Sequence, residues 1–324
     1  MSNFHNLDRF EALSKSLPLT GGKVFFVADS ADAWFERLQR LFPVDVDGDV
    51  RLFSNLDTAV GACTASRGDV IVVFPDYTMT VTAAGSLALD VEGITLIGLG
   101  NGNDRPTISY TTAATGTVLV TAAYITMDNF RFIANGDTVD VNVAIDINTG
   151  GNFFTLKNSH AILTDTSAQM VRFIQTDSGT DYLKVENCVL EGDTTAGLES
   201  VIDIVSDNKG TIIKNNYISA STGDSRGLIH FTGADTAARI SHCLITGNHL
   251  WNQTGDSLSY GIHKDSDGGF FDAIISHNNI RITSDSGDGW FRVHSGVNNA
   301  SLFENYGVNV AGERGVIIGV VSST

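Results

Sequence analysis

A short motif, in which an apolar residue is followed by one or two polar residues and then by asparagine, recurs seven times between residues 127 and 305. Its asparagines are Asn129, Asn158, Asn187, Asn215, Asn248, Asn278 and Asn305. Neighbouring members are separated by 29, 29, 28, 33, 30 and 27 positions. A fixed period of this length is typical of solenoid proteins, in which each repeat forms one turn. The motif that ends at Asn305 has the form of the first four, whereas those that end at Asn248 and Asn278 carry one inserted residue.

A second series of apolar residues runs in phase with the asparagines. Its members are Ile145, Phe173, Ile202, Ile229, Ile262, Phe291 and Ile317, with spacings of 28, 29, 27, 33, 29 and 26. The surrounding runs are four to six residues of Val, Ile, Phe and Tyr, interrupted by Gly, Asn, Asp and Ser, which is typical of short strands. Helix pairs are disfavoured because residues 177–180 and 207–210 are turn formers where a helix would have to run. The two series together predict an all-β, single-stranded parallel β-helix of about 29 residues per turn.

The asparagine of the motif has a physical role in this interpretation. Val185 and Glu186 alternate between the inside and the outside of the coil, but Cys188 and Leu190 must again point inward, so the alternation slips by one residue at Asn187. A bend with positive φ produces that slip, and asparagine tolerates the left-handed conformation better than most residues. We therefore expect a structural asparagine ladder along the coil.

The N-terminal part of the chain reads differently and suggests three segments. Residues 1–22 form an arm in which Phe4, Leu7, Phe10 and Leu13 are spaced as one helical stripe, suited to docking on a partner protein or on the rod itself. Residues 23–66 form a small α/β cap, with a strand at 23–28, a helix at 30–42 and an amphipathic helix at 55–66. The parallel β-helix occupies residues 67–324, and the helix at its entry covers strand edges that would otherwise invite further stacking.

Composition narrows the possible partners. The 324 residues carry 20 basic and 37 acidic side chains, a net charge of −17, and no basic cluster, which argues against nucleic acid as a partner. No apolar run reaches the length of a membrane span, and no secretion signal opens the sequence. The three cysteines, Cys63, Cys188 and Cys243, are far apart and read as structural thiols.

Two stretches resemble known families. Residues 55–60, followed by residues 67–77, resemble the entry of pectin-lyase-like right-handed β-helix proteins, although Asp76 stands where those proteins usually have glycine. Residues 22–29 and 98–107 resemble virion structural proteins of tailed bacteriophages, and this likeness covers about the first third of the chain. In such phages, β-helix proteins occur as trimeric capsid decoration or head fibres and as tailspikes.

The resemblance also raises the question of an enzyme, because several β-helix proteins cleave polysaccharides. The Asn-Thr-Asp, Asp-Asp, Gly-His-Gly and Arg-x-Lys motifs of polygalacturonase-type hydrolases are absent. A lyase site needs a calcium-binding Asp cluster beside an Arg or Lys base, and no two arginines share a turn position with a neighbouring Asp pair. Asp146 and Asp203 follow the second series two turns apart, about 10 Å, with Gln175 between them, which is long for a glycosidase pair. We expect no catalytic residue, no metal site and no cofactor.

Two further groups of residues are candidates for binding. His230, His263 and His294 each end a strand of the second series and could stack on consecutive turns, either as a partly exposed column or as a subunit or metal contact. Trp251 and Tyr260 could bind a ring from one loop, although core or rim packing explains them equally.

These observations favour a non-enzymatic phage structural protein, a trimeric capsid decoration (cement or head-fibre) protein. Its partners would be the major capsid protein and itself, since closed cyclic contacts avoid open polymerisation. It would be made in the host cytoplasm and lie on the capsid exterior, with no membrane contact. The alternative is a tailspike-type protein that binds or depolymerises host polysaccharide.

Overall fold

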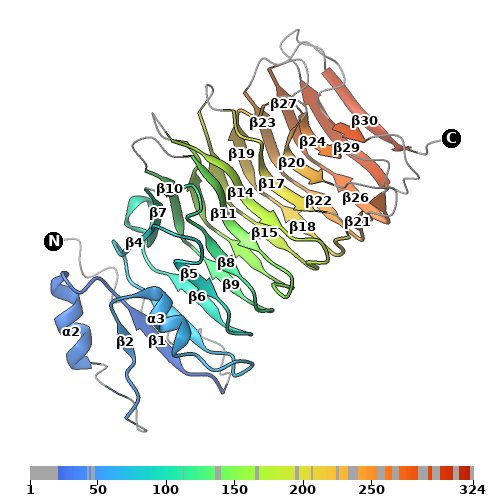
Figure 1. Ribbon diagram of the computed structural model, residues 1–324. Coiled ribbons are helices and arrows are strands. Elements are labelled where there is room, and N and C mark those ends of the chain that lie inside the picture. The colour runs from blue at the N-terminus through green and yellow to red at the C-terminus, as the bar shows by residue number, and fades with distance from the viewer. Residues whose placement is uncertain are drawn as a thin grey trace.

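The computed structural model describes residues 21–321, apart from 42–43, 45–47, 112, 136–139, 165–167, 194–196, 206, 224–225, 233–239, 254–259, 265–269, 284–290, 294–299 and 309–313. The predicted arm with Phe4, Leu7, Phe10 and Leu13 lies outside the described residues. The described part is a parallel β-solenoid of about eight turns with about 29 residues per turn, as the sequence period predicts. Its colours change steadily along the rod in Figure 1, because each turn stacks on the one before it.

Each turn contributes one short strand to each of three parallel ladders. The first ladder contains β3 (Val70–Val73), β6 (Thr95–Gly98), β9 (Thr126–Asp128), β12 (Thr155–Lys157), β15 (Lys184–Glu186), β18 (Ile212–Lys214), β22 (Leu244–Thr246) and β26 (Ala273–Ser276). The second contains β4 (Thr78–Val81), β7 (Thr107–Tyr110), β10 (Arg131–Ala134), β13 (His160–Ile162), β16 (Val189–Glu191), β19 (Tyr217–Ala220), β23 (His249–Asn252) and β27 (Asn279–Ile282). The third contains β5 (Leu87–Leu89), β8 (Val118–Val120), β11 (Val141–Ile147), β14 (Met170–Thr176), β17 (Ser200–Val205), β20 (Gly227–Thr232), β24 (Tyr260–Lys264) and β28 (Phe291–Val293).

The core is the column of side chains that all three ladders turn inward. Along the first ladder the central residues pair one with the next and are 0–4% exposed; they are Ile71, Leu96, Met127, Leu156, Val185, Ile213, Ile245, Ile275 and Leu302. Branched and long apolar side chains of similar size fill equivalent places, so burial is continuous along the axis.

The two ends of the solenoid are built differently from its middle. At the N-terminal end, β1 (Val24–Val27) pairs with β3 and with β2 (Leu52–Phe53), so residues 24–27 extend the first ladder. Helix α2 spans Ala33–Leu41. Helix α3 spans Leu56–Gly61, is capped by the Asn55 side chain, and buries Leu56, Ala59 and Val60. Both helices are shorter than the sequence suggests.

At the C-terminal end, β29 (Ala300–Val308) continues the first and second ladders together, because it pairs with both β26 and β27. Strand β30 (Arg314–Val321) then runs antiparallel to β29. Three small elements complete the described structure, namely the 3₁₀ turn Gly102–Asp104 and the pair β21 (Ile240–Ser241) and β25 (Phe270–Phe271). The end of the rod is therefore not formed by another parallel turn.

The asparagine motif divides into two structural groups. Asn129, Asn158, Asn187 and Asn215 have φ of 53° to 66° and form the bend between the first and second ladders, as predicted. In the last three turns the bend belongs instead to Gly247, His277 and Glu304, whose φ values are 53° to 67°. The sequence register at residue 303 was therefore wrong by one position, since Leu302 is the buried partner of the ladder and Phe303 is 39% exposed.

The remaining asparagines of the motif, Asn248, Asn278 and Asn305, lie one residue after this bend and point into the coil, as does Asn216, which directly follows Asn215. Asn216, Asn248, Asn278 and Asn305 are 0–2% exposed. The side-chain amide of Asn248 donates to Oδ1 of Asn278 (2.9 Å) and to the carbonyl of Ile213 (2.9 Å), while its Oδ1 accepts from the Asn216 backbone N–H (3.0 Å). The pattern repeats from Asn216 to Asn305, so every turn in this section passes hydrogen bonds to its neighbour and the buried polar atoms are satisfied.

The second series of the sequence also needed two corrections. In the third ladder Ile174, not Phe173, pairs with Ile145 and Ile202, although Phe173 is buried beside them. Ile317 belongs to β30 and pairs with Asn305, so it is not a member of the third ladder. Apolar runs in these strands contain adjacent buried residues, which allows the wrong one to be chosen.

Candidate functional site

A row of polar residues crosses the third ladder at one register position. Asp146, Gln175, Asp203, His230, His263 and Arg292 pair successively from β11 to β28. They form one row because the parallel strands pair in register. Side chains alternate along a strand, so Asp203 points to the opposite side from its neighbours Ile202 and Ile204, which lie in the core. The sequence placed Asp146, Gln175 and Asp203 on consecutive turns, and the structure confirms that placement.

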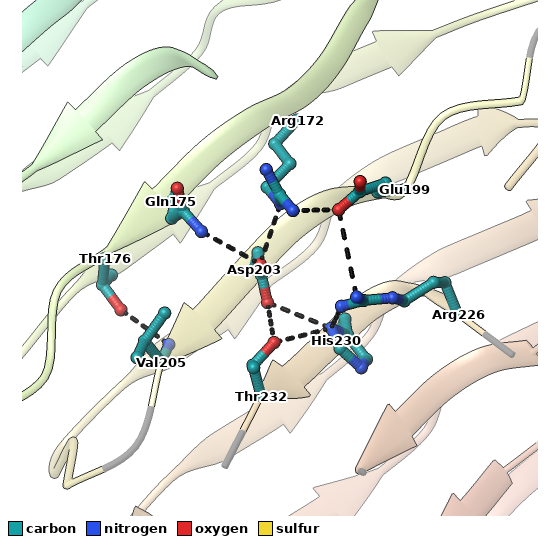
Figure 2. A network of polar contacts seen from close by, with 9 residues as sticks. All are labelled: Arg172, Gln175, Thr176, Glu199, Asp203, Val205, Arg226, His230 and Thr232. Atoms are coloured by element: carbon teal, nitrogen blue, oxygen red, sulfur yellow. Dashed lines mark hydrogen bonds and ion pairs between the residues drawn. The ribbon is translucent and has the colours of Figure 1, made fainter. Parts of the chain in front are cut away.

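Asp203 is the centre of the polar cluster shown in Figure 2. Its Oδ1 accepts hydrogen bonds from His230 Nδ1 (3.0 Å) and from the Thr232 hydroxyl (2.6 Å). Its Oδ2 accepts from Gln175 Nε2 (3.2 Å) and lies 3.1 Å from Arg172 Nε, a contact that is an ion pair without good hydrogen-bond alignment. Both oxygens are thus occupied, and the Asp203 side chain is 1% exposed.

Two arginines from neighbouring turns meet on Glu199 beside this carboxylate. Arg172 binds Glu199 Oε2, and Arg226 Nη2 lies 4.0 Å from the same oxygen. The other guanidinium nitrogen of Arg226 lies 3.2 Å from His230 Nδ1. The sequence did not anticipate that two arginines would converge here, because Glu199 and Arg226 lie outside the aligned strand positions.

The environment of Asp203 favours its ionised form. Burial alone would raise the pKa of Asp203, but the hydrogen bonds from His230 and Thr232, with the charges of His230 and Arg172, outweigh burial and lower it. Because an ionised carboxylate can only accept, its contact with His230 Nδ1 (3.0 Å) indicates that this nitrogen of the imidazole carries a proton.

Asp146, two strands away, has the opposite character. Its pKa is raised by burial and by the nearby charge of Asp177. Two carboxyl groups with opposite pKa shifts are what an acid and base pair requires. Their separation of about 10 Å, however, exceeds the usual glycosidase range, and Gln175 lies between them. Asp203 is also buried and has protein partners on both oxygens, so the cluster is suited to joining β14, β17 and β20 rather than to proton transfer.

The predicted histidine column is present for its first two members, but both are buried instead of partly exposed. His230 and His263 pair across β20 and β24, and their rings lie 5.3 Å apart. Tyr260 stacks on His263 at 4.6 Å. The next residue in the row is Arg292, whereas His294 lies outside the described residues.

Other candidates from the sequence are separated or buried. Trp251 lies in β23 under the Arg281 guanidinium (4.6 Å), and Tyr260 lies in the third ladder, so they do not form one ring-binding loop. Burial raises the pKa of the thiols Cys63, Cys188 and Cys243 to about 12, which makes them poor nucleophiles. Within the described ranges, no group of three or more His, Cys, Asp or Glu residues is placed to hold a metal ion.

One surface feature was missed at the sequence level. The rings of Tyr124, Phe153 and Tyr182 stack on the outside of the rod, at 4.5 Å and 4.3 Å between centroids. Their constant interval of 29 residues, five positions before Asn129, Asn158 and Asn187, was a visible signal.

Comparison with protein-family models, with curated proteins and with solved structures gives no match for this chain. Among the described residues, no helix is both long enough and apolar enough to cross a bilayer.

Proposed function

We propose that this chain is a non-enzymatic structural protein of a tailed-phage virion, a trimeric decoration protein of the capsid exterior. The observation that carries the proposal is the state of Asp203. The most deeply buried carboxylate of the polar row contacts polar groups from the turns on both sides of its own, which makes it a cross-link of three turns of the rod. A buried cluster of ion pairs and hydrogen bonds holds strands in register without needing a substrate.

Two further observations support a structural role. The antiparallel strand β30 at one end and the helix α3 at the other make the stack finite, as a displayed protein requires. The net charge of −17 keeps a rod soluble at the high local concentration of a decorated shell. The phage assignment itself rests on the resemblance of the first third of the chain to virion proteins, and the trimer rests on the symmetry argument.

The test is the copy number of the protein in purified particles, measured by quantitative mass spectrometry against the major shell protein. An abundance comparable with that of the shell protein is expected. A copy number of a few trimers per particle would indicate that the protein belongs to the tail, and absence of the protein from particles would overturn the proposal. Sedimentation equilibrium of the purified protein tests the trimer separately.

A tailspike-type protein that cleaves polysaccharide is the second candidate. It is favoured by one observation, the opposite pKa shifts of Asp146 and Asp203 on the same row. If that pair is catalytic, both Asp146→Asn and Asp203→Asn abolish release of reducing ends from host surface glycan. Under the structural proposal the unmodified protein releases none.

A further inference from the structure

The three stacked rings occupy equivalent positions of consecutive turns. The backbone N–H of Tyr124 donates to the carbonyl of Asn152, and that of Phe153 donates to the carbonyl of Asp181, both at 2.9 Å. The corresponding N–H of Tyr182 donates to the backbone carbonyl of Lys209 at 2.7 Å. The rings are nearly parallel, with interplanar angles of 10° and 7°. They form a continuous aromatic ladder along the axis of the rod.

The backbone under the aromatic ladder is strained. Tyr124, Phe153 and Tyr182 have φ of 59°, 60° and 62°, a conformation that bulky residues rarely adopt. The turns on either side carry Gly93 and Gly210 at this position, with φ of 76° and 70°, and glycine adopts that conformation without strain. Glycine therefore meets the needs of the fold, and large rings at the surface point to a role outside it.

The two ends of the aromatic ladder differ. At one end the ring of Tyr182 lies against Gly210, where an added Cβ would come within 2.3 Å of the ring. At the other end only backbone atoms of Ser66 lie within 4 Å of a Cβ added at Gly93, so no ring packs there. Tyr124 is accordingly 54% exposed, compared with 36% for Phe153 and 39% for Tyr182. One face of Tyr124 lies against Phe153, and the described structure leaves the other open.

Charge indicates what this open face can receive. A tyrosine face carries the negative part of the ring quadrupole and attracts cations, most often guanidinium groups. The backbone N–H of Gly93 donates to the carbonyl of Ala123 (3.0 Å), which places Gly93 beside Tyr124 and Glu92 one residue earlier on the same neighbouring turn. The whole chain carries a charge of −17. An open aromatic face on an acidic rod, with a glutamate in the neighbouring turn, is complementary to a basic group.

We propose that the open face of Tyr124, with Glu92, is a docking site for an arginine side chain in a basic segment of a partner protein. The guanidinium stacks on the tyrosine and the carboxylate of Glu92 balances its charge. This site goes beyond the structural role proposed above and does not depend on it.

The test is fluorescence anisotropy with a fluorescein-labelled peptide that carries three arginines separated by pairs of glycines. The same peptide with citrulline in place of arginine keeps the shape and removes the charge. Measurements at 0.15 M salt screen the general attraction of the acidic rod. The matched variants are Tyr124→Gly, which suits φ of 59° and removes the open face, and Tyr182→Gly, which removes a ring at the covered end.

We expect the Kd of the arginine peptide to rise about tenfold in Tyr124→Gly and about threefold in Glu92→Gln, the scale of a cation–π contact and of a partly screened charge. Tyr182→Gly changes it less than twofold, and Tyr124→Phe, which keeps the ring, retains most of the affinity. Thermal unfolding of each variant controls for folding.

Three results would overturn the proposal. The first is equal binding of the arginine peptide to the unmodified protein and Tyr124→Gly, and the second is equal binding of the citrulline peptide. The third is binding of neutral dextran oligosaccharides that depends on Tyr124 while binding of the arginine peptide does not, which would make the aromatic ladder a glycan platform.

Discussion

Replacing Asp203 with asparagine tests the polar cluster most directly, because the change keeps the shape of the side chain and removes its charge. In the native protein the carboxylate accepts from His230 and Thr232 on one oxygen and from Gln175 on the other, with Arg172 at 3.1 Å. An amide can still accept on one side, but its NH₂ group then faces donors on the other. The ion pair with Arg172 is lost in a site that is 1% exposed.

The expected loss of stability follows from these contacts. Removing one partner of a buried ion pair destabilises a protein by about 3–5 kcal/mol. Arg172 retains Glu199 as a partner, so we expect the lower end, about 3 kcal/mol. Because turns of a solenoid interact mainly with their neighbours, the effect should concentrate in β14, β17 and β20.

Urea unfolding combined with hydrogen exchange of these strands measures the effect. The loss should also depend on pH. The pKa of Asp203 is lowered in the folded state, so the carboxylate contributes stability above its unfolded value of about 3.9. This contribution disappears as the pH falls through the lower folded pKa, and the difference between the native protein and Asp203→Asn should shrink in that range.

Asp146→Asn is the matched control on the same row. The pKa of Asp146 is raised, so its ionised form is disfavoured by folding and its replacement should leave stability at pH 7 unchanged or slightly increased. Equal effects of the two substitutions, or a change below about 0.5 kcal/mol for Asp203→Asn, would refute the reasoning, because such a change is typical of surface sites.

Three other outcomes are expected. Gly210→Ala should destabilise the protein by about 2 kcal/mol or more, because the new methyl group would clash with a ring and the residue has an unfavourable φ. Gly179→Ala has the same unfavourable φ but open space around it, and should cost about 1 kcal/mol. Similar urea midpoints for the two variants would contradict this prediction. Asn248→Ala leaves two buried backbone groups of the preceding turn, the Ile213 carbonyl and the Asn216 N–H, without their side-chain partner and should destabilise by about 2–3 kcal/mol in the same assay. A loss below about 1 kcal/mol would be inconsistent with the hydrogen-bonded column. Cys188 and Cys243 should resist iodoacetamide at pH 8 in the folded protein and react in urea, because burial raises each pKa to about 12; rapid labelling of the native protein would show that they are accessible.

The solenoid was predictable from the sequence because its period is a property of the whole chain. The exact register was harder to assign, since asparagine suits two different places in one turn. At Asn187 it adopts the left-handed bend, and at Asn278 it lies one residue later, where its amide bonds inside the coil. Both roles give an asparagine at nearly the same interval in the sequence, so only the strand pairing in the structure distinguishes them.

The candidate site shows the same division. The row of Asp146, Gln175 and Asp203 follows from the period, because equivalent positions of stacked strands must be neighbours. The convergence of Arg172 and Arg226 on Glu199 does not follow from the period, because it depends on how far long side chains reach from the edges of the strands. Periodicity determines which backbones are adjacent, but rotamers determine which charges meet.

The column of buried asparagines also limits how the length of the rod can change. Each of these side chains bonds to a backbone group of the preceding turn, and Asn216, Asn248 and Asn278 also bond to the side-chain amide of the next turn. Insertion or removal of one complete turn leaves every such group matched, whereas a shorter insertion within the strands shifts the amides out of line. The rod can therefore lengthen or shorten in this section only by whole turns of about 4.8 Å each, because a partial turn would break the hydrogen bonds between the asparagines.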